Sequence, residues 1–355
     1  DLAQRQMDGA GGILSFELAG DMDDAKAFLE ALDRFTLAVS LGGVESLIEL
    51  PAGMTHEPIP KEERLEIGIS DTLIRVSVGI DDVDDLNIET MSSGHVDTDS
   101  CYGCPVACGH VTDFAEADVD GAFDDSRAEW GPEYETIGMM GANTDITDVT
   151  AVNELANRAD TLGMDSITLG NAISFTMECV EAGLVDYDLE WGDAHKAADL
   201  VEDVAHRDSD VGDALAEGTR RAAEILCDGD ERAREAAVEV KGMELPAYEP
   251  RASFGMALAY ATSDRGGCHQ RAWPIGSDAL GGERDPFGTD GHAEVVVDEQ
   301  DENALTYSMV ACSFTAYNYE RACEWLNELG YDVDVAELET IGERAWNVAR
   351  LFNLR

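Results

Sequence analysis

Residues 148–163 read DVTAVNELANRADTLG, and this stretch decides the fold of the larger part of the chain. Its apolar residues recur with the 3.6-residue period of an α-helix, and Gly163 stands where that helix should stop. Gly183 and Gly330 mark two further helix ends. The same period appears in four other stretches, at residues 167–182, 192–206, 211–226 and 320–328. The sequence therefore predicts a mainly α part beyond about residue 100.

The first ninety residues have a different character. Apolar residues at helical spacing in 21–32 lie between loops, whereas 35–41 and 73–79 (LIRVSVG) are rich in the β-branched residues that favour strands. These segments predict a small α/β domain. A short polar, glycine-containing stretch then separates it from the helical part. We expect three segments: an α/β domain at 1–90, a junction at 91–100 and a mainly α part at 101–355.

The charge of the chain excludes several classes of protein. It has 355 residues, of which 23 are Lys or Arg and 75 are Asp or Glu, giving a net charge of −52. A nucleic-acid-binding surface needs the opposite sign. No apolar run approaches the roughly 18–20 residues of a membrane-spanning helix, and the N-terminal residues do not resemble a signal peptide. Because concentrated salt screens the repulsion between carboxylates, we predict a halophilic, cytoplasmic protein that binds neither nucleic acid nor membranes.

Three of the eight cysteines are crowded into Cys101-Tyr-Gly-Cys104-Pro-Val-Ala-Cys108. Soft thiolates hold iron–sulfur clusters, and a four-iron cluster needs four of them, three of which can come from one loop. A zinc site would need a second pair of ligands, and the chain contains no second C-x-x-C. The spacing favours an iron–sulfur cluster with a distant fourth ligand, while zinc and unliganded structural cysteines stay open.

Part of the sequence resembles a known family of pyridoxal-phosphate enzymes. The stretches 12–18, 35–46, 51–56 and 68–81 resemble the C-terminal domain of the cystathionine synthase and lyase group. The resemblance implies that Ser40 lies beside the cofactor and that Arg75 binds the substrate α-carboxylate with both guanidinium nitrogens. Such enzymes also need a Schiff-base lysine. Lys26 and Lys61, the only lysines in residues 1–90, are expected on surface helices.

The remaining chain resembles a second, unrelated family. The cysteine cluster is followed by the motifs 131–136 (GPEYET), 160–165 (DTLGMD), 241–248, 260–269 and 346–355. Together they resemble the aldehyde ferredoxin oxidoreductases, which are tungsten or molybdenum pterin enzymes. The resemblance spans about residues 95–355, corresponds to the two helical C-terminal domains of that family, and implies that Cys312 is the fourth ligand of a 4Fe-4S cluster.

The second resemblance also implies roles for other residues. Asp160, Gly163 and Asp165 would contact the pterin, while Glu135 and His269 would lie near the metal and handle the protons released when an aldehyde becomes an acid. The family places another pterin loop, with Asp and Gly, before the fourth cysteine. Here residues 307–312 read YSMVAC, so that contact is expected to be absent.

These observations suggest an oxidoreductase that converts aldehydes to carboxylic acids and passes electrons to ferredoxin. Each half lacks the part it normally works with, so we expect an incomplete site and no turnover by this chain in either family's assay. One alternative is a remnant of a trans-sulfuration enzyme that uses pyridoxal phosphate, and another is an inactive fusion. His206 and Glu154 could bind iron at a homodimer contact, although a solvated helix face explains them equally well.

We predict that folding depends on salt. With 75 acidic residues, the chain should unfold in dilute buffer and refold in concentrated KCl, because the screening length shortens from roughly 10 Å at 0.1 M to about 3 Å at 1 M. Thermal melts followed by circular dichroism check this. A melting temperature that is the same in dilute and concentrated KCl would contradict the prediction.

Overall fold

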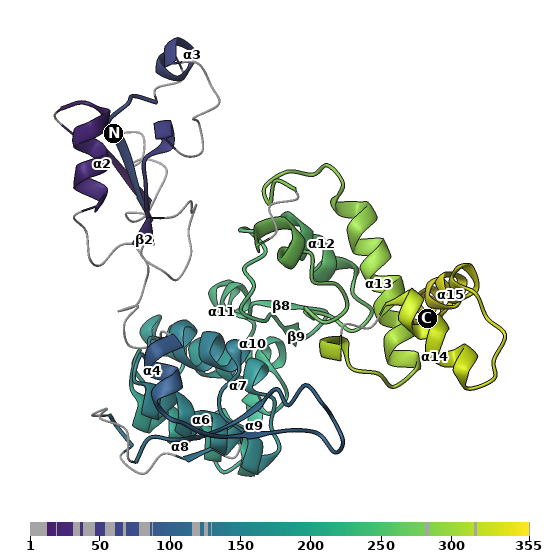
Figure 1. Ribbon diagram of the computed structural model, residues 1–355. Coiled ribbons are helices and arrows are strands. Elements are labelled where there is room, and N and C mark those ends of the chain that lie inside the picture. The colour runs from purple at the N-terminus through teal and green to yellow at the C-terminus, as the bar shows by residue number, and fades with distance from the viewer. Residues whose placement is uncertain are drawn as a thin grey trace. The chain divides into compact units, whose positions relative to one another are not determined.

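A computed structural model of the chain (Figure 1) divides into two compact units, Asp1–Thr90 and Met91–Arg355. Each unit is described by itself. The residues that the structure describes are 13–18, 20–30, 36–37, 47–53, 61–66, 69–77, 86, 88–115, 121–123, 127–128, 130–280, 284–315 and 318–354.

The first unit contains a four-stranded sheet. Its strands lie in the order β1-β4-β3-β2, and β4 pairs antiparallel with both β1 and β3, whereas β2 pairs parallel with β3. The described strands are β1 (Ile13–Glu17), β2 (Thr36–Leu37), β3 (Leu47–Glu49) and β4 (Leu73–Ser77), and the helices are α2 (Met22–Glu30), a 3₁₀ turn η1 (Pro51–Gly53) and α3 (Lys61–Glu66). The predicted strand at 73–79 and helix at 21–32 are confirmed within the described residues.

The core of this unit joins α2 to the sheet. Ala25 and Leu29 are one helical turn apart on α2, and both pack with Leu50 and Ile74 out of contact with water. Phe16 and Phe28 border this core, with their rings meeting edge to face at 6.2 Å between centroids. Burial of these apolar side chains gives the sheet one covered face.

The second unit is mainly α. The boundary between the units falls within α4 (Ile88–Ser93), and β5 (His95–Asp99) follows, so the predicted junction at 91–100 carries the end of a helix and a strand. The remaining strands are β6 (Gly109–Asp113), β7 (Arg127–Ala128), β8 (Glu239–Val240) and β9 (Met243–Glu244). The helices are α5 (Tyr134–Thr136), α6 (Val149–Leu162), α7 (Ser166–Glu181), α8 (Ala194–His206), α9 (Asp210–Leu215), α10 (Thr219–Leu226), α11 (Glu231–Ala236), α12 (Phe254–Thr262), α13 (His292–Ser308), α14 (Tyr319–Glu328) and α15 (Val335–Asn353).

Local capping explains where α6 and α7 begin and end. The Asp148 carboxylate accepts hydrogen bonds from the amides of Thr150 and Ala151 at the start of α6. Gly163 ends the helix in the left-handed conformation, at φ 75°. Asp165 then caps α7 by accepting a bond from the Thr168 amide at 2.8 Å. The predicted helices and the predicted stop at Gly163 are confirmed.

One predicted helix is wrong. Residues 211–226 show a single helical period, but the structure breaks them into α9 and α10. Gly218 adopts φ 89° between the two helices, and the buried carboxylate of Glu244 accepts bonds from the amide and hydroxyl of Thr219, at 2.7 and 2.8 Å. A distant side chain therefore begins a new helix where local periodicity indicates continuity.

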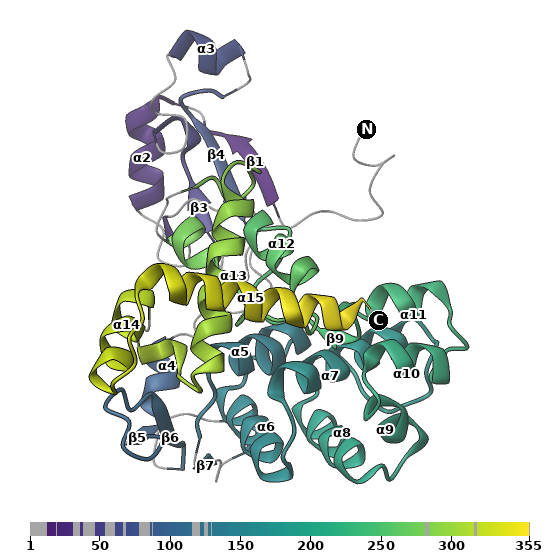
Figure 2. The ribbon, with the colours of Figure 1, turned by 90° about the vertical axis from the view of Figure 1, so that its right-hand side faces the viewer.

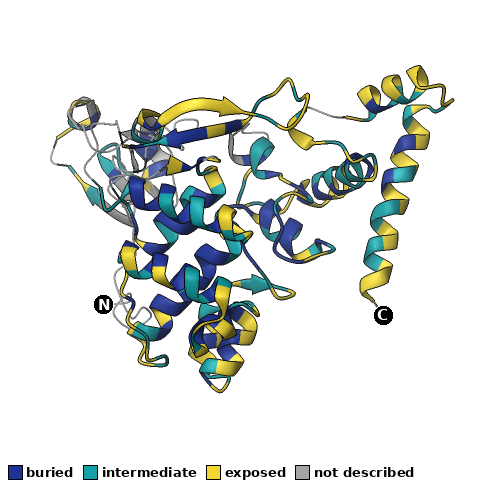
Figure 3. Ribbon diagram, turned by 90° about the horizontal axis from the view of Figure 1, so that it is seen from below, coloured by how far each residue is buried: buried dark blue, intermediate teal, exposed yellow. Residues whose placement is uncertain are grey.

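The apolar interior of this unit lies between its helices. Leu155 on α6, Ile173 on α7 and Leu200 on α8 are fully buried. At the other end α15 crosses α13 and packs against it (Figure 2), and Leu305, Ala322 and Leu338 form a second small core there. Figure 3 shows that exposed residues cover much of the helix that ends at the C-terminus. A small α/β part followed by a mainly α part, the predicted fold class, is confirmed.

Several helices carry no clear sequence signal. Helix α12 (FGMALAYAT) is apolar on nearly every side, and acidic residues interrupt the apolar positions of α13. Of the helices in the described part of the chain, none is both long and apolar enough to cross a membrane.

Close packing of α7 against the π-helical segment η2 (Ile137–Gly141) gives a prediction. A Cβ at Gly170 would overlap the backbone of Met139. We expect Gly170→Ala to lower the free energy of unfolding, because overpacking costs about 1–3 kcal/mol and outweighs the ~1 kcal/mol by which alanine favours a helix over glycine.

Denaturant melts measure this effect. Glu178→Ala, at an exposed position of the same helix, is the control and should stay within about 0.5 kcal/mol of the wild type. A Gly170→Ala variant as stable as wild type would show that η2 can move away from α7.

Candidate functional site

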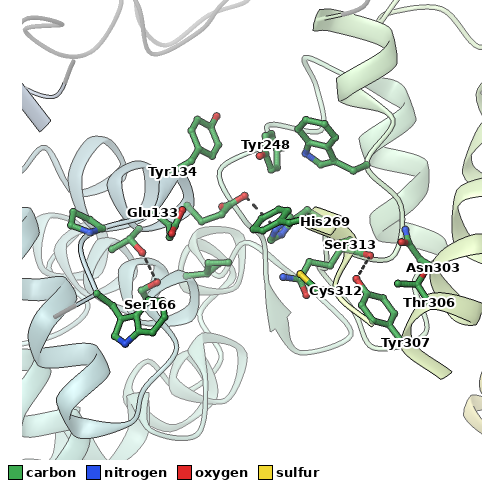
Figure 4. Close-up of a pocket in the computed structure, with 18 of the residues that line it drawn as sticks. Glu133, Tyr134, Ser166, Tyr248, His269, Asn303, Thr306, Tyr307, Cys312 and Ser313 are labelled. Atoms are coloured by element: carbon green, nitrogen blue, oxygen red, sulfur yellow. Dashed lines mark hydrogen bonds and ion pairs between the residues drawn. The ribbon is translucent and has the colours of Figure 1, made fainter. Parts of the chain in front are cut away.

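A cavity of about 1140 Å³ lies within the second unit (Figure 4). Its walls come from the segment at 130–136, the ends of α6 and α7, the loop at 269–273, helix α13 and residues 312–314. Of the residues predicted for the site, four line it: Glu135, Asp160, His269 and Cys312. The fold thus brings together residues that are separated by up to 177 positions in the sequence.

Glu135 lies at the centre of this arrangement. It belongs to α5, a single turn that leads into η2, and its side chain is only 13% exposed. The Ala247 amide donates to Oε2 at 2.7 Å, whereas Oε1 is buried and has no hydrogen-bond partner in the described structure. Burial raises the pKa of Glu135 to about 7, with a smaller contribution from the charge of Asp165. Near neutral pH this carboxyl can therefore both take up and release a proton.

His269 is the second titratable group. Its Nδ1 lies 3.8 Å from Oε1 of Glu135, which is longer than a hydrogen bond. Burial, helped by the nearby Arg265 charge, lowers the pKa of His269 to about 4. At neutral pH the imidazole is therefore uncharged, and its contact with Glu135 is polar rather than an ion pair.

Aromatic rings adjoin these two groups. Tyr134 stacks on Tyr248 with 5.1 Å between ring centroids, and Tyr248 lies 5.6 Å from His269 and 5.9 Å from Trp273. Figure 4 shows Tyr134, Tyr248 and His269 on one side of the cavity. The Tyr260 hydroxyl donates a hydrogen bond of 2.9 Å to the backbone carbonyl of Tyr248. Our sequence reasoning missed these rings, although Tyr134 and Tyr248 lie inside the motifs at 131–136 and 241–248.

The three residues predicted for pterin contact occupy the turn between α6 and α7. Asp160 is an exposed residue on the last turn of α6 that lines the cavity, and partial desolvation of its carboxyl by neighbouring atoms raises its pKa. Gly163 forms the left-handed helix end, and the exposed Asp165 is used as an N-cap. Helix capping alone thus accounts for Gly163 and Asp165, whereas Asp160 has no such structural role.

The cysteines predicted to hold a cluster lie at two places. Cys101 and Cys108 are exposed and Cys104 is half-buried in the loop that joins β5 to β6, where Gly103 and Ala107 adopt left-handed conformations. Cys312 is exposed at the cavity wall. Among the described residues, no three His, Cys, Asp or Glu side chains lie close enough together to hold a metal ion.

The segment that departs from the family pattern has a contact of its own. The Tyr307 hydroxyl donates to the carbonyl of Gln270 at 2.9 Å, and the guanidinium of Arg271 lies over the Tyr307 ring at 4.9 Å. Tyr307 therefore fastens the end of α13 to the loop that carries His269.

Comparison with known proteins identifies the family. The family model for aldehyde ferredoxin oxidoreductase, domains 2 and 3, matches residues 74–355. The chain belongs to the aldehyde ferredoxin oxidoreductase family. The tungsten-containing aldehyde ferredoxin oxidoreductase of Thermococcus kodakarensis is 36% identical over 271 residues, and that of Pyrococcus furiosus is 35% identical over 268. Each match covers 72% of this chain and 42% of the relative, so the chain spans less than half the length of these oxidoreductases.

The start of this aldehyde ferredoxin oxidoreductase family member matches a different group. The model for pyridoxal-phosphate-dependent enzymes of Cys/Met metabolism matches residues 1–92. The cystathionine gamma-lyase of Dictyostelium discoideum is 57% identical over 86 residues, which are 24% of this chain and 22% of the lyase. Both resemblances seen in the sequence are thus confirmed.

Few of the expected pyridoxal-site residues can be placed. Arg75 lies on β4, opposite Ser15 on β1 and Glu49 on β3. Ser40 lies outside the described residues. Lys26 is exposed on α2, and Lys61 is exposed on α3 and paired with Asp71. The prediction that both lysines lie on surface helices is confirmed.

The shifted pKa values predict how stability changes with pH. Glu135 is protonated up to about pH 7 when folded but only to about 4.5 when unfolded, so its contribution to stability falls as pH rises through that range. His269 acts oppositely between about 4 and 6.5. Above about pH 6.5 Glu135 is the one of these two groups that still titrates, and its ionisation should cost the wild type roughly 1 kcal/mol by about pH 8.

Glu135→Gln should remove this loss, because an amide does not titrate yet can still accept from Ala247. Denaturant melts across the pH range provide the measurement, and Glu178→Gln, an exposed carboxylate on α7, should keep the wild-type slope. An unchanged slope in Glu135→Gln would mean that the pKa of Glu135 is not raised.

Proposed function

We propose that the unit Met91–Arg355 takes part in oxidising an aldehyde to a carboxylic acid, as the names of its relatives indicate. The observation that carries this proposal is the pair Glu135 and His269 in one cavity, the first with a pKa near 7 and the second uncharged. The reaction consumes one aldehyde and one water and yields one acid, two protons and two electrons. A proton acceptor that works at neutral pH is therefore needed beside the reacting carbon.

Glu135 is suited to accept the first proton. The Ala247 amide holds Oε2, so the unpartnered Oε1 is the atom free to receive it. The uncharged His269, 3.8 Å away, is a polar neighbour of the protonated Glu135, which then releases its proton near neutral pH. Their burial keeps bulk water from competing for the same protons.

We further propose that Asp160, Gly163 and Asp165 hold a tungsten or molybdenum pterin. Support comes from the position of Asp160 at the cavity wall, where its carboxylate has no hydrogen-bond partner among the described residues. Gly163 lets the backbone approach a ligand closely, since no side chain projects from it. When bound, such a group would take the electron pair from the aldehyde.

The cysteines are proposed to carry these electrons onward. Cys101, Cys104, Cys108 and Cys312 form a donor set of four thiols, the ligand type that a 4Fe-4S cluster prefers. None of the four is buried, so iron can reach each of them. A bound cluster would pass electrons one at a time to ferredoxin, the acceptor in the names of the relatives.

The environment and assembly of the protein are also proposals. A charge of −52 suits a halophilic cytoplasm. A homodimer through Glu154 and His206 has weaker support, because Glu154 pairs with Arg158 at 2.8 Å and His206 lies 3.5 Å from Glu202. Contacts within the protomer thus already account for both residues.

A second function, trans-sulfuration with pyridoxal phosphate, is favoured by the 57% identity to a cystathionine gamma-lyase. In that case Ser40 would lie beside the cofactor, and Arg75 would bind the substrate carboxylate. The described lysines do not fit a Schiff base, because Lys26 is exposed and Lys61 is held by Asp71. We therefore derive no chemical step for this unit.

The cluster proposal predicts the iron content. After anaerobic reconstitution the protein should bind roughly four irons, and Cys312→Ala should lose the cluster or keep about three, because one iron lacks its thiolate. Iron analysis and visible absorption measure this.

Cys323→Ala is the matched control, since this half-buried thiol contacts the Val333 carbonyl and lies outside the motif. It should keep the full iron content. If Cys312→Ala binds as much iron as wild type with the same spectrum, Cys312 is not a ligand.

A further inference from the structure

The described part of the cavity wall is acidic. Five carboxylates line it, and none of the lining residues that the structure describes is Lys or Arg. The five are Glu133, Glu135, Asp160, Glu299 and Glu302.

These five carboxylates lie outside the ion pairs that the structure describes. Elsewhere arginines pair closely with carboxylates, as Arg271 does with Asp264 at 2.8 Å. Within the described residues no Lys or Arg forms an ion pair with any of the five. Glu299 accepts only the amide of Trp273, and burial raises its pKa as it does that of Glu302. Glu299 and Glu302 are thus half-buried, and although the charge of Arg284 acts on Glu299 without forming an ion pair, ionisation of these two carboxyls costs free energy.

The buried oxygen of Glu135 is an independent sign of a missing partner. Oε1 is out of contact with water, has no hydrogen bond in the part of the chain described and belongs to a residue that lines the cavity. A polar atom in that position costs about 1–3 kcal/mol unless a ligand satisfies it.

The aromatic rings supply the other half of a cation site. Tyr134, Tyr248 and Trp273 form a continuous wall, with ring centroids 5.1 Å apart between Tyr134 and Tyr248 and 5.9 Å apart between Tyr248 and Trp273. Ring faces attract a cation within about 6 Å, and such rings recognise quaternary ammonium groups. Because the ring of Tyr248 also lies 5.6 Å from that of His269, a cation held by this wall would sit next to the Glu135–His269 pair.

We propose that the cavity binds a small aldehyde that carries an ammonium group, with the cation against Tyr134, Tyr248 and Trp273 and the aldehyde toward Glu135 and His269. The identity of the aldehyde end rests on the proposed function, whereas the preference for a cation rests on the cavity alone. The same wall disfavours aldehydes that carry a carboxylate.

The test compares ligands of one shape and different charge. Choline, its uncharged carbon isostere 3,3-dimethyl-1-butanol and the anion 3,3-dimethylbutanoate are titrated into the full chain in concentrated KCl, with binding followed by calorimetry. We expect choline to bind at least tenfold tighter than the alcohol, which corresponds to about 1.4 kcal/mol, and the anion to bind weakest. Choline should also release protons near pH 7, since a cation favours the ionised form of Glu135.

Variants locate the binding site. Trp273→Leu and Glu299→Gln should each weaken choline binding severalfold and leave the alcohol nearly unaffected. Trp191→Leu and Glu294→Gln, which replace the same residue types outside the cavity, should bind choline like the wild type.

Two outcomes would overturn the proposal. Equal affinity for choline and the alcohol would show that charge is not recognised, and choline binding unchanged in both cavity variants would assign it to the acidic surface. Iron content is measured on the same samples. A full cluster without cation preference would overturn the cation proposal and leave the proposed function standing. A cation preference without a cluster would support the cation proposal and contradict the cluster in the proposed function.

Discussion

The hydrogen bond from the Ala247 amide to Glu135 holds the site together. It joins residues 112 positions apart at 2.7 Å, and it ties the turn α5 to the segment that carries Tyr248. By occupying Oε2 it leaves Oε1 without a hydrogen-bond partner in the described structure. Burial of the carboxyl raises its pKa to about 7, although the hydrogen bond from Ala247 opposes that shift. The stacked rings of Tyr134 and Tyr248 meet across the same connection. The position of the Glu135 carboxyl and the stacking of Tyr134 on Tyr248 thus both depend on the contact between these two segments.

The C-terminal helix helps to hold the loop that carries His269. Arg350 on α15 donates to the carbonyl of Thr262 at 2.6 Å, and Lys241 donates to that of Ser263. Both cations thereby satisfy carbonyls at the end of α12, where the helix dipole is negative. The loop that begins there leads to His269, and Tyr307 fastens its far side to α13. Contacts from three segments distant in sequence therefore hold the loop that carries His269.

The two units place different limits on function. In Met91–Arg355 the described structure brings Glu135, Asp160, His269 and Cys312 to one cavity, although the hairpin thiols are not gathered with Cys312. Asp1–Thr90 has a higher sequence identity to its relatives, 57% over 86 residues to a cystathionine gamma-lyase, yet its described lysines lie exposed on the surface. The unit with the higher sequence identity to its relatives is thus not the unit whose described residues form a cavity with titratable side chains.

The division into an α/β part and a helical part, the helix pair α6–α7 and the resemblance to both families could all be predicted from the sequence. These features are local, since periodicity, a capping Asp165 and a left-handed Gly163 act within a few residues. Tertiary structure alone decided the break at Gly218, which Glu244 imposes from 25 positions away. It also decided the pKa of Glu135 and the wall formed by Tyr248 and Trp273, because burial and ring contacts arise only when distant segments pack together.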